Sequence, residues 1–138
     1  MDAPVAATAA PPAKTSRTRV FVVEDSELIR QRLLSMLRGM SGVEVVGNSE
    51  TASDAIAGIL AARPDVVVLD IKLKAGSGIE VLRTIKRRMG EAAVIMLTNY
   101  ATEVYRDKCL QAGAEYFLDK TNEFERLCPI IDQLKRTK

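Results

Sequence analysis

The stretch RVFVVED, residues 19–25, decides the fold class of this chain together with the stretch DVVVLD, residues 65–70. Both are short, apolar and rich in β-branched residues, which is typical of buried parallel strands. Glu24 and Asp25 close the first run, and Asp70 closes the second. Because ligands of open α/β sheets bind outside the carboxyl ends of the strands, we expect these carboxylates to share one crevice. Such a cluster is unfavourable unless it binds a cation or shifts its pKa values, so it predicts a site for a hard metal ion such as Mg²⁺.

The rest of the chain alternates between strand patterns and helix patterns from residue 18 onward. The predicted strands are residues 19–24, 43–48, 66–70, 93–98 and 115–118. The predicted helices are residues 26–39, 52–62, 78–89, 101–112 and 122–136. Five βα units in succession predict an α/β doubly wound fold, with a parallel sheet, right-handed crossovers and helices on both faces.

One residue conflicts with the last helical pattern. Pro129 lies inside it, and a proline there removes an intrahelical hydrogen bond. We therefore expect a short first turn, followed by a restart of the helix near Cys128 or Pro129.

Composition narrows the classes of function. The chain has 138 residues, 47% of them apolar, which fits one globular domain. The net charge of +2 is too small to argue for nucleic-acid binding, and the basic runs at residues 86–88 and 135–138 are interpreted as solvated helix faces. Because there is no histidine, His-ligated zinc and Ser-His or Cys-His catalysis are excluded. Residues 1–16 are rich in Ala and Pro and are predicted to form a flexible tail, which leaves residues 17–138 as the folded domain.

Cysteine use and hydropathy bear on the compartment. Cys109 and Cys128 are the only cysteines, they form no CxxC motif, and they are interpreted as reduced thiols of a cytosolic protein. No stretch approaches the ~20 apolar residues that a membrane span needs. We therefore expect a cytoplasmic protein without a membrane partner.

Four sequence elements are predicted to meet at one edge of the sheet. They are Glu24 and Asp25 after the first strand, Asp70 after the third, Thr98 at the end of the fourth, and Lys120 after the fifth. Singly, the acidic pair could be a helix N-cap and Lys120 a solvated surface charge, but this does not explain why all of them reach one edge. In the motifs VFVVEDS, VVVLDIKLKAGSG, VIMLTNYA and GAEYFLDK, the chain resembles a response-regulator receiver domain of bacterial two-component signalling, of the chemotaxis-regulator type.

The resemblance implies a flavodoxin-like (βα)5 receiver fold with the strand order 2-1-3-4-5. It implies that Asp70 is the phosphoacceptor, which takes a phosphoryl group from a histidine kinase or histidine phosphotransferase. Lys120 would supply a fixed cation, and the Thr98 hydroxyl would donate a hydrogen bond to the bound phosphoryl group. The implied cofactor is Mg²⁺ or Mn²⁺, with these ligands: Glu24 through water, Asp25, Asp70 and the backbone carbonyl of Lys72.

The resemblance also implies a switch. Thr98 would move toward the phosphoryl group, and Phe117 would rotate inward to fill the space it leaves, which would change the helix 4–strand 5–helix 5 surface. A static core Phe117 is the alternative. Lys72, Asn99 and Tyr100 flank the crevice and are expected to modulate the lifetime of the phosphorylated state. Lys74 stands where receivers commonly carry proline, which predicts a more mobile loop after the phosphoacceptor.

The leading function is a stand-alone receiver that signals by protein–protein contact with an unknown downstream partner. A phosphorelay intermediate or phosphate sink, and a receiver fragment of a larger DNA-binding regulator, are the alternatives. In each case the domain is not an enzyme beyond its own phosphorylation and dephosphorylation, and it binds no nucleic acid directly. Homodimerisation on phosphorylation is left open.

Overall fold

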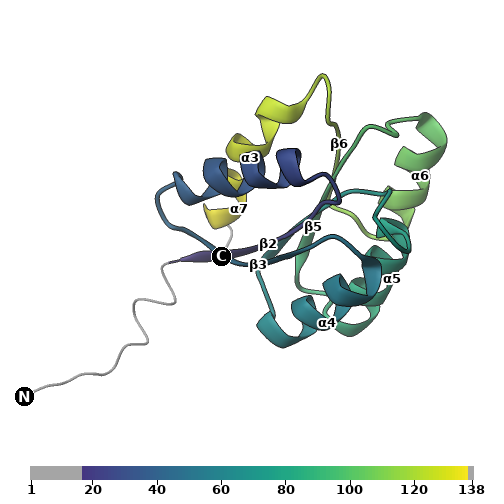
Figure 1. Ribbon diagram of the computed structural model, residues 1–138, viewed down its shortest axis with the longest axis horizontal. Coiled ribbons are helices and arrows are strands. Elements are labelled where there is room, and N and C mark those ends of the chain that lie inside the picture. The colour runs from purple at the N-terminus through teal and green to yellow at the C-terminus, as the bar shows by residue number, and fades with distance from the viewer. Residues whose placement is uncertain (1–16, 137–138) are drawn as a thin grey trace, which may run out of the picture.

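The computed structural model describes residues 17–136 (Figure 1). The predicted tail at residues 1–16 lies outside the described residues. The strands are β2 (Thr18–Val23), β3 (Val43–Ser49), β4 (Val66–Leu69), β5 (Ala93–Thr98) and β6 (Tyr116–Asp119). The helices are α3 (Glu27–Arg38), α4 (Ala52–Ala62), α5 (Gly78–Arg88), α6 (Glu103–Gln111), the 3₁₀ helix η1 (Phe124–Arg126) and α7 (Leu127–Arg136).

The five strands form one sheet in the order β3-β2-β4-β5-β6. Every pairing is parallel. In chain order this is 2-1-3-4-5, so the predicted fold class and strand order are confirmed. Helices α3 and α7 cover one face of the sheet, and α4, α5 and α6 cover the other (Figure 1).

The central strand β4 shows why the strands read as continuous apolar runs. Val66 and Val68 belong to the core beneath α3 and α7, whereas Val67 and Leu69 belong to the core beneath α4, α5 and α6. Because successive side chains point to opposite faces, a strand covered on both sides must be apolar at every position.

The conflict at Pro129 resolves as predicted. The 3₁₀ helix η1 forms the short first turn, and α7 restarts at Leu127. Pro129 is therefore the third residue of α7. In the first turn of a helix an N–H has no intrahelical partner, so proline costs little there.

The loop after Asp70, for which Lys74 predicts greater mobility, makes backbone hydrogen bonds to its neighbours. The Lys74 N–H donates to the Glu50 carbonyl at 2.9 Å, and the Ala52 N–H donates to the Ala75 carbonyl at 2.9 Å. The Gly78 N–H donates to the Ile71 carbonyl at 2.7 Å. Backbone hydrogen bonds at both ends thus hold this loop against its neighbours without a proline.

We predict that Gly78→Ala lowers the free energy of unfolding by about 3 kcal/mol or more. A Cβ at Gly78 would overlap the carbonyl oxygen of Asp70, so the loop and the strand end would have to separate. Urea unfolding measures the change. Gly39→Ala is the matched control, because a Cβ there lies 3.5 Å or more from its nearest neighbours. Equal stability of the two variants would contradict the steric argument.

Candidate functional site

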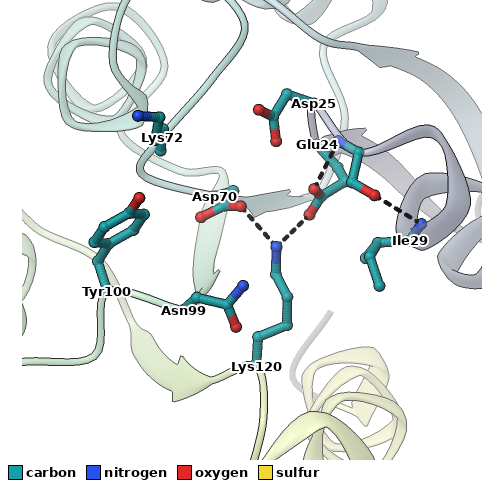
Figure 2. A pocket seen from close by; sticks show the side chains of 9 residues that line it. Glu24, Asp25, Ile29, Asp70, Lys72, Asn99, Tyr100 and Lys120 are labelled. Carbon is teal, nitrogen blue, oxygen red and sulfur yellow. Dashed lines mark hydrogen bonds and ion pairs between the residues drawn. The ribbon is translucent and has the colours of Figure 1, made fainter.

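A pocket of about 250 Å³ opens at the carboxyl ends of β2 and β4, where the sequence predicted the site (Figure 2). It is lined by Glu24, Asp25, Ser26, Ile29, Asp70, Lys72, Asn99, Tyr100 and Lys120. The strand order places β2 beside β4, and the chain reverses direction across the sheet between them, which is where open α/β sheets bind ligands.

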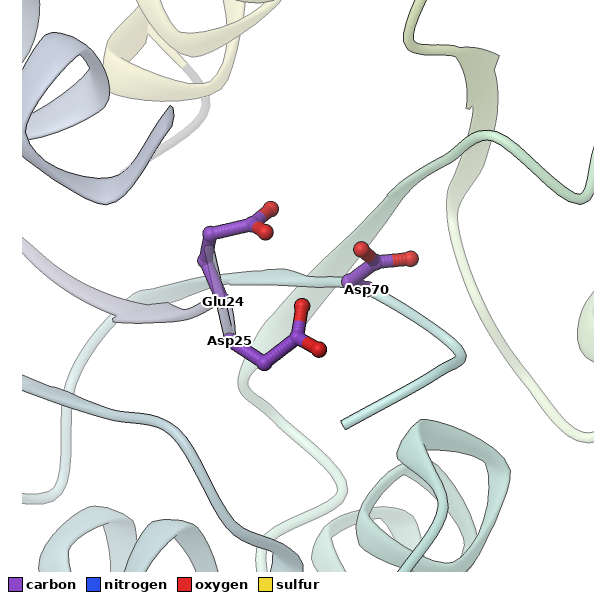
Figure 3. A group of neighbouring side chains, drawn as sticks. All are labelled: Glu24, Asp25 and Asp70. Atoms are coloured by element: carbon purple, nitrogen blue, oxygen red, sulfur yellow. The ribbon is translucent and has the colours of Figure 1, made fainter. Parts of the chain in front are cut away.

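Three carboxylates meet in this pocket (Figure 3). Glu24, Asp25 and Asp70 each offer an oxygen atom, and these oxygens lie within 4.8 Å of one another. Glu24 is 1% exposed and Asp70 is 5% exposed, while Asp25 is half-buried. Among residues 17–136 the Asp25 carboxylate has no hydrogen-bond or ion-pair partner. A set of hard oxygen donors with one unpaired carboxylate fits Mg²⁺ or Mn²⁺.

Lys120 closes the pocket from the opposite side. Its Nζ atom lies 2.8 Å from Oε1 of Glu24 and 2.7 Å from Oδ2 of Asp70, as the dashed lines in Figure 2 show. Its side chain is only 8% exposed, so Lys120 is not a solvated surface charge. Burial lowers the pKa of Lys120, but its hydrogen bonds and charge contacts with Asp70 and Glu24 outweigh this, and the net pKa is raised. The ammonium group is therefore a fixed cation at neutral pH.

Asp70 is held in one orientation. Its Oδ1 atom accepts a hydrogen bond from the Ile71 N–H at 2.7 Å, and its Oδ2 atom accepts one from Lys120. A carboxylate fixed in this way presents a defined oxygen edge to the pocket, which favours in-line reaction with an incoming group.

Burial is the main influence on Glu24 and raises the pKa of its carboxyl group. Hydrogen bonds from Lys120 and from the Ser26 N–H act in the opposite direction but do not cancel it. The charge of Asp70 raises the pKa further. Glu24 therefore holds its proton more tightly in the folded protein than in the unfolded chain.

This has a consequence for stability in metal-free buffer. Because the folded-state pKa of Glu24 is above the ordinary value of 4.5, its contribution to stability is present below that value and is lost as the pH rises through the folded pKa. We expect the unfolding free energy of the wild type, relative to Glu24→Gln, to fall as the pH rises from 4.5 toward neutrality. Urea unfolding across this range measures it. Glu44→Gln, at an exposed site on β3, is the control, and a rising difference for Glu24→Gln would contradict the prediction.

Thr98 lies at the end of β5 with no solvent exposure. Its Oγ1 atom accepts a hydrogen bond from the Tyr100 N–H at 3.1 Å.

Three residues are expected to modulate the site. Lys72 and Tyr100 lie on the far side of Asp70 from Glu24, and Asn99 lies below Asp70 in Figure 2. All three line the pocket, as predicted from their positions beside the strand ends.

Phe117 lies in the core beneath α4, α5 and α6, at 4% exposure, and its rotation in a switch stays a prediction. The Arg106 guanidinium lies 4.9 Å from the centre of the ring, and its Nη1 atom donates to the Phe117 carbonyl at 3.3 Å. Residue spacing could not show that α6 supplies this cation.

Ser26 and Ile29, which line the pocket, and Arg30 beside it were not predicted from the sequence as site residues. Ser26 caps α3 by accepting a hydrogen bond from the Ile29 N–H, a role that the sequence signal of Ser before a helix could have found. Arg30 is buried, and its Nη1 atom donates to the Glu24 carbonyl at 2.9 Å. It fixes the backbone from which Glu24 enters the pocket.

Comparison with known proteins gives the family. The family model described as the response regulator receiver domain matches residues 20–132. This chain belongs to the response regulator receiver domain family. Such domains act in two-component systems, and a phosphoryl-acceptor aspartate and Mg²⁺ are standard for them.

Two curated relatives belong to longer proteins. The chain is similar to the DNA-binding transcriptional activator DevR/DosR of Mycobacterium tuberculosis, at 36% identity over 74% of this chain and 47% of that protein. It is also similar to a protein-glutamate methylesterase/protein-glutamine glutaminase of Koribacter versatilis, at 37% identity over 80% of this chain and 31% of that protein. The chain thus spans half or less of the length of these two relatives.

Solved structures agree on the fold. The chain is similar to the response regulator domain of Thermotoga maritima CheB, with 26% identity and a TM-score of 0.77 over 88% of this chain and 95% of that one. A two-component response regulator of the LuxR family from Aurantimonas sp. gives 25% identity and a TM-score of 0.81 over 89% of this chain and 88% of that one. In the part of the chain that the structure describes, no helix has the length and apolar character needed to cross a bilayer.

Proposed function

We propose that this chain is a phosphoacceptor receiver in which Asp70 takes a phosphoryl group from a phosphohistidine of a histidine kinase or histidine phosphotransferase. The observation that carries the proposal is the position of Asp70. It lies within 4.8 Å of two other carboxylates on one side and 2.7 Å from the Lys120 ammonium on the other. No ordinary structural role calls for three carboxylates and a buried lysine at one strand edge.

The proposed reaction moves one phosphoryl group. An oxygen of the Asp70 carboxylate forms the new bond to phosphorus as the phosphorus–nitrogen bond of the donor breaks, and the leaving imidazole takes up a proton. Lys120 neutralises charge on the Asp70 side of the pocket. Glu24, Asp25, Asp70 and the Lys72 carbonyl would hold Mg²⁺ or Mn²⁺, which when bound neutralises charge on the phosphoryl oxygens.

The switch follows from the contact between Thr98 and Tyr100. When the Thr98 hydroxyl turns toward a phosphoryl group, the Tyr100 N–H loses the acceptor that it has at 3.1 Å. The loop after β5 must then rearrange at the edge of the helix 4–strand 5–helix 5 surface, formed here by α6, β6 and α7. Phe117 moves only if its contact with Arg106 breaks. Lys72, Asn99 and Tyr100 control the access of water to the acyl phosphate.

We propose a stand-alone signalling domain that changes its affinity for a downstream protein and has no activity on other substrates. Homodimerisation would be one form of this output. Two free thiols fit a reducing, cytoplasmic location.

A receiver part of a larger DNA-binding regulator is a second candidate, because the chain covers only 47% of a DNA-binding transcriptional activator to which it is similar. A phosphate sink without output would differ from both in lacking a phosphorylation-dependent complex.

The test is intact-mass analysis after incubation with a small acyl-phosphate donor. We expect one phosphoryl adduct that requires Mg²⁺ and disappears with a chelator. Borohydride reduction converts an aspartyl phosphate to homoserine, so peptide mapping then locates the acceptor. An adduct at a residue other than Asp70, or none from either the small donor or a histidine kinase, would overturn the proposal.

A further inference from the structure

A second pocket lies beside the first, on the side of α5 and α6. It has a volume of about 300 Å³ and is lined by Ile71, Lys72, Gly76, Ser77, Tyr100 and Tyr105. Lys72 and Tyr100 line both pockets, so they form the wall between them. The rings of Tyr100 and Tyr105 meet edge to face with their centres 6.4 Å apart. Ile71, at 6% exposure, gives the pocket an apolar floor.

Basic side chains of α5 and α6 lie beyond this pocket. Burial raises the pKa of the Cys109 thiol, and the charges of Arg83 on α5 and Lys108 on α6 oppose this rise, so both cations lie near the same sulfur. Both side chains are exposed, as is Lys72. None of these three cations has a carboxylate partner at ion-pair distance among residues 17–136.

An exposed apolar residue completes the surface. Val104 is 68% exposed and lies one helical turn before Lys108, on the same stripe of α6. We name as the α5–α6 face the set Lys72, Arg83, Tyr100, Val104, Tyr105 and Lys108. It combines an aromatic pocket, an apolar side chain and three unpaired cations, the composition of a site for a partner with aromatic anchors and opposite charge.

We propose that the α5–α6 face binds an acidic segment of a partner protein, with an aromatic side chain of that segment in the tyrosine-lined pocket. The pocket has room for one side chain, and the unpaired cations complement carboxylates rather than a neutral strand. A nucleic-acid backbone fits less well, since it demands many regularly spaced cations. The whole chain carries a net charge of only +2, and Glu103 and Asp107 interrupt the positive charge of α6.

The shared wall gives this face a dependence on phosphorylation, and this part of the inference rests on the proposed function. A phosphoryl group at Asp70 brings about −1.5 to −2 charges next to Lys72. It attracts the Lys72 ammonium toward the first pocket and repels an acidic segment from the second. Tyr100 moves as well, because its N–H donates a hydrogen bond to Thr98 Oγ1, and Thr98 turns toward the phosphoryl group. Phosphorylation therefore weakens binding at the α5–α6 face.

The probe is a short, blocked, fluorescently labelled peptide of Asp and Glu residues with one central Trp, and binding is measured by anisotropy. We expect saturable binding that weakens roughly threefold to tenfold in Arg83→Glu and in Lys108→Glu. Arg38→Glu is the matched control, because Arg38 is an exposed cation in the last turn of α3, on the other face of the sheet. Its affinity should stay within about twofold of the wild type.

Several outcomes would overturn the proposal: no binding, an equal loss in Arg38→Glu, equal binding of a peptide with Ala in place of Trp, or preferential binding of a DNA duplex through the same residues. Adding the acyl-phosphate donor and Mg²⁺ should then weaken peptide binding several-fold. If neither the acyl-phosphate donor nor a histidine kinase gives an adduct by intact mass, the proposed function fails while the peptide result stands. If the adduct forms and the affinity is unchanged, the link to phosphorylation fails.

Discussion

Asp70→Asn abolishes the phosphoryl adduct and leaves the fold intact. The amide is not a nucleophile at phosphorus, but it keeps the shape of the carboxylate. Its single oxygen can accept from the Ile71 N–H or from the Lys120 ammonium, which in the wild type donate to the two different carboxylate oxygens at 2.7 Å each. The variant therefore loses one hydrogen bond, but removing one charge relieves its repulsion of Glu24, so we expect the metal-free variant to be about as stable as the wild type. Intact mass reports the adduct, and urea unfolding reports the stability.

Asp25→Asn is the matched comparison, since it makes the same chemical change in the same pocket. It removes the unpaired carboxylate but keeps Asp70, the phosphoacceptor. The adduct should therefore form slowly, and its rate of formation should recover in part at high Mg²⁺ concentration. Asp70→Asn should show no recovery at any Mg²⁺ concentration. If Asp70→Asn keeps a full adduct, the acceptor lies elsewhere and the assignment of Asp70 is wrong.

The sequence predicted the fold because local patterns and the global architecture agree. Runs such as VVVL in β4 are apolar at every position, which only a strand covered on both faces requires. The parallel arrangement then brings every strand's carboxyl end to one edge. Lys120 is 96 positions from Glu24 and 50 positions from Asp70 in the sequence. The three residues could nevertheless be placed together, because each follows the carboxyl end of a strand.

Contacts that depend on which side chain reaches across between elements could not be predicted. The positions of Arg106 and Phe117 in the sequence do not show that the guanidinium packs on the ring at 4.9 Å. The buried Arg30 donates a hydrogen bond to the backbone carbonyl of Glu24. Because every residue has such a carbonyl, the sequence does not show which one will accept. The backbone hydrogen bonds that join the loop after Asp70 to residues beside β3 likewise have no sequence signature.

Lys120→Met separates charge neutralisation from metal binding. The side chain of Met has a similar length but no charge, so the phosphoryl pocket loses its fixed cation. We expect the rate of adduct formation to fall about 100-fold, which is the usual effect of removing one group that stabilises developing charge. Mg²⁺ affinity should rise, because the ammonium that now neutralises Glu24 and Asp70 is gone. Intact-mass time courses and calorimetric Mg²⁺ titration measure the two effects.

The opposite direction of the two effects is what makes this variant informative. A variant that merely misfolds would lose both adduct formation and Mg²⁺ binding. Lys74→Met is the control, because Lys74 lies in the loop after Asp70 and is largely exposed. Its ammonium group pairs with Glu50 at 3.5 Å and not with the three carboxylates of the pocket. It should match the wild type in both measurements. If Lys120→Met phosphorylates at the wild-type rate, the lysine only balances two buried carboxylates, and charge neutralisation in the reaction must come from the metal side of the pocket alone.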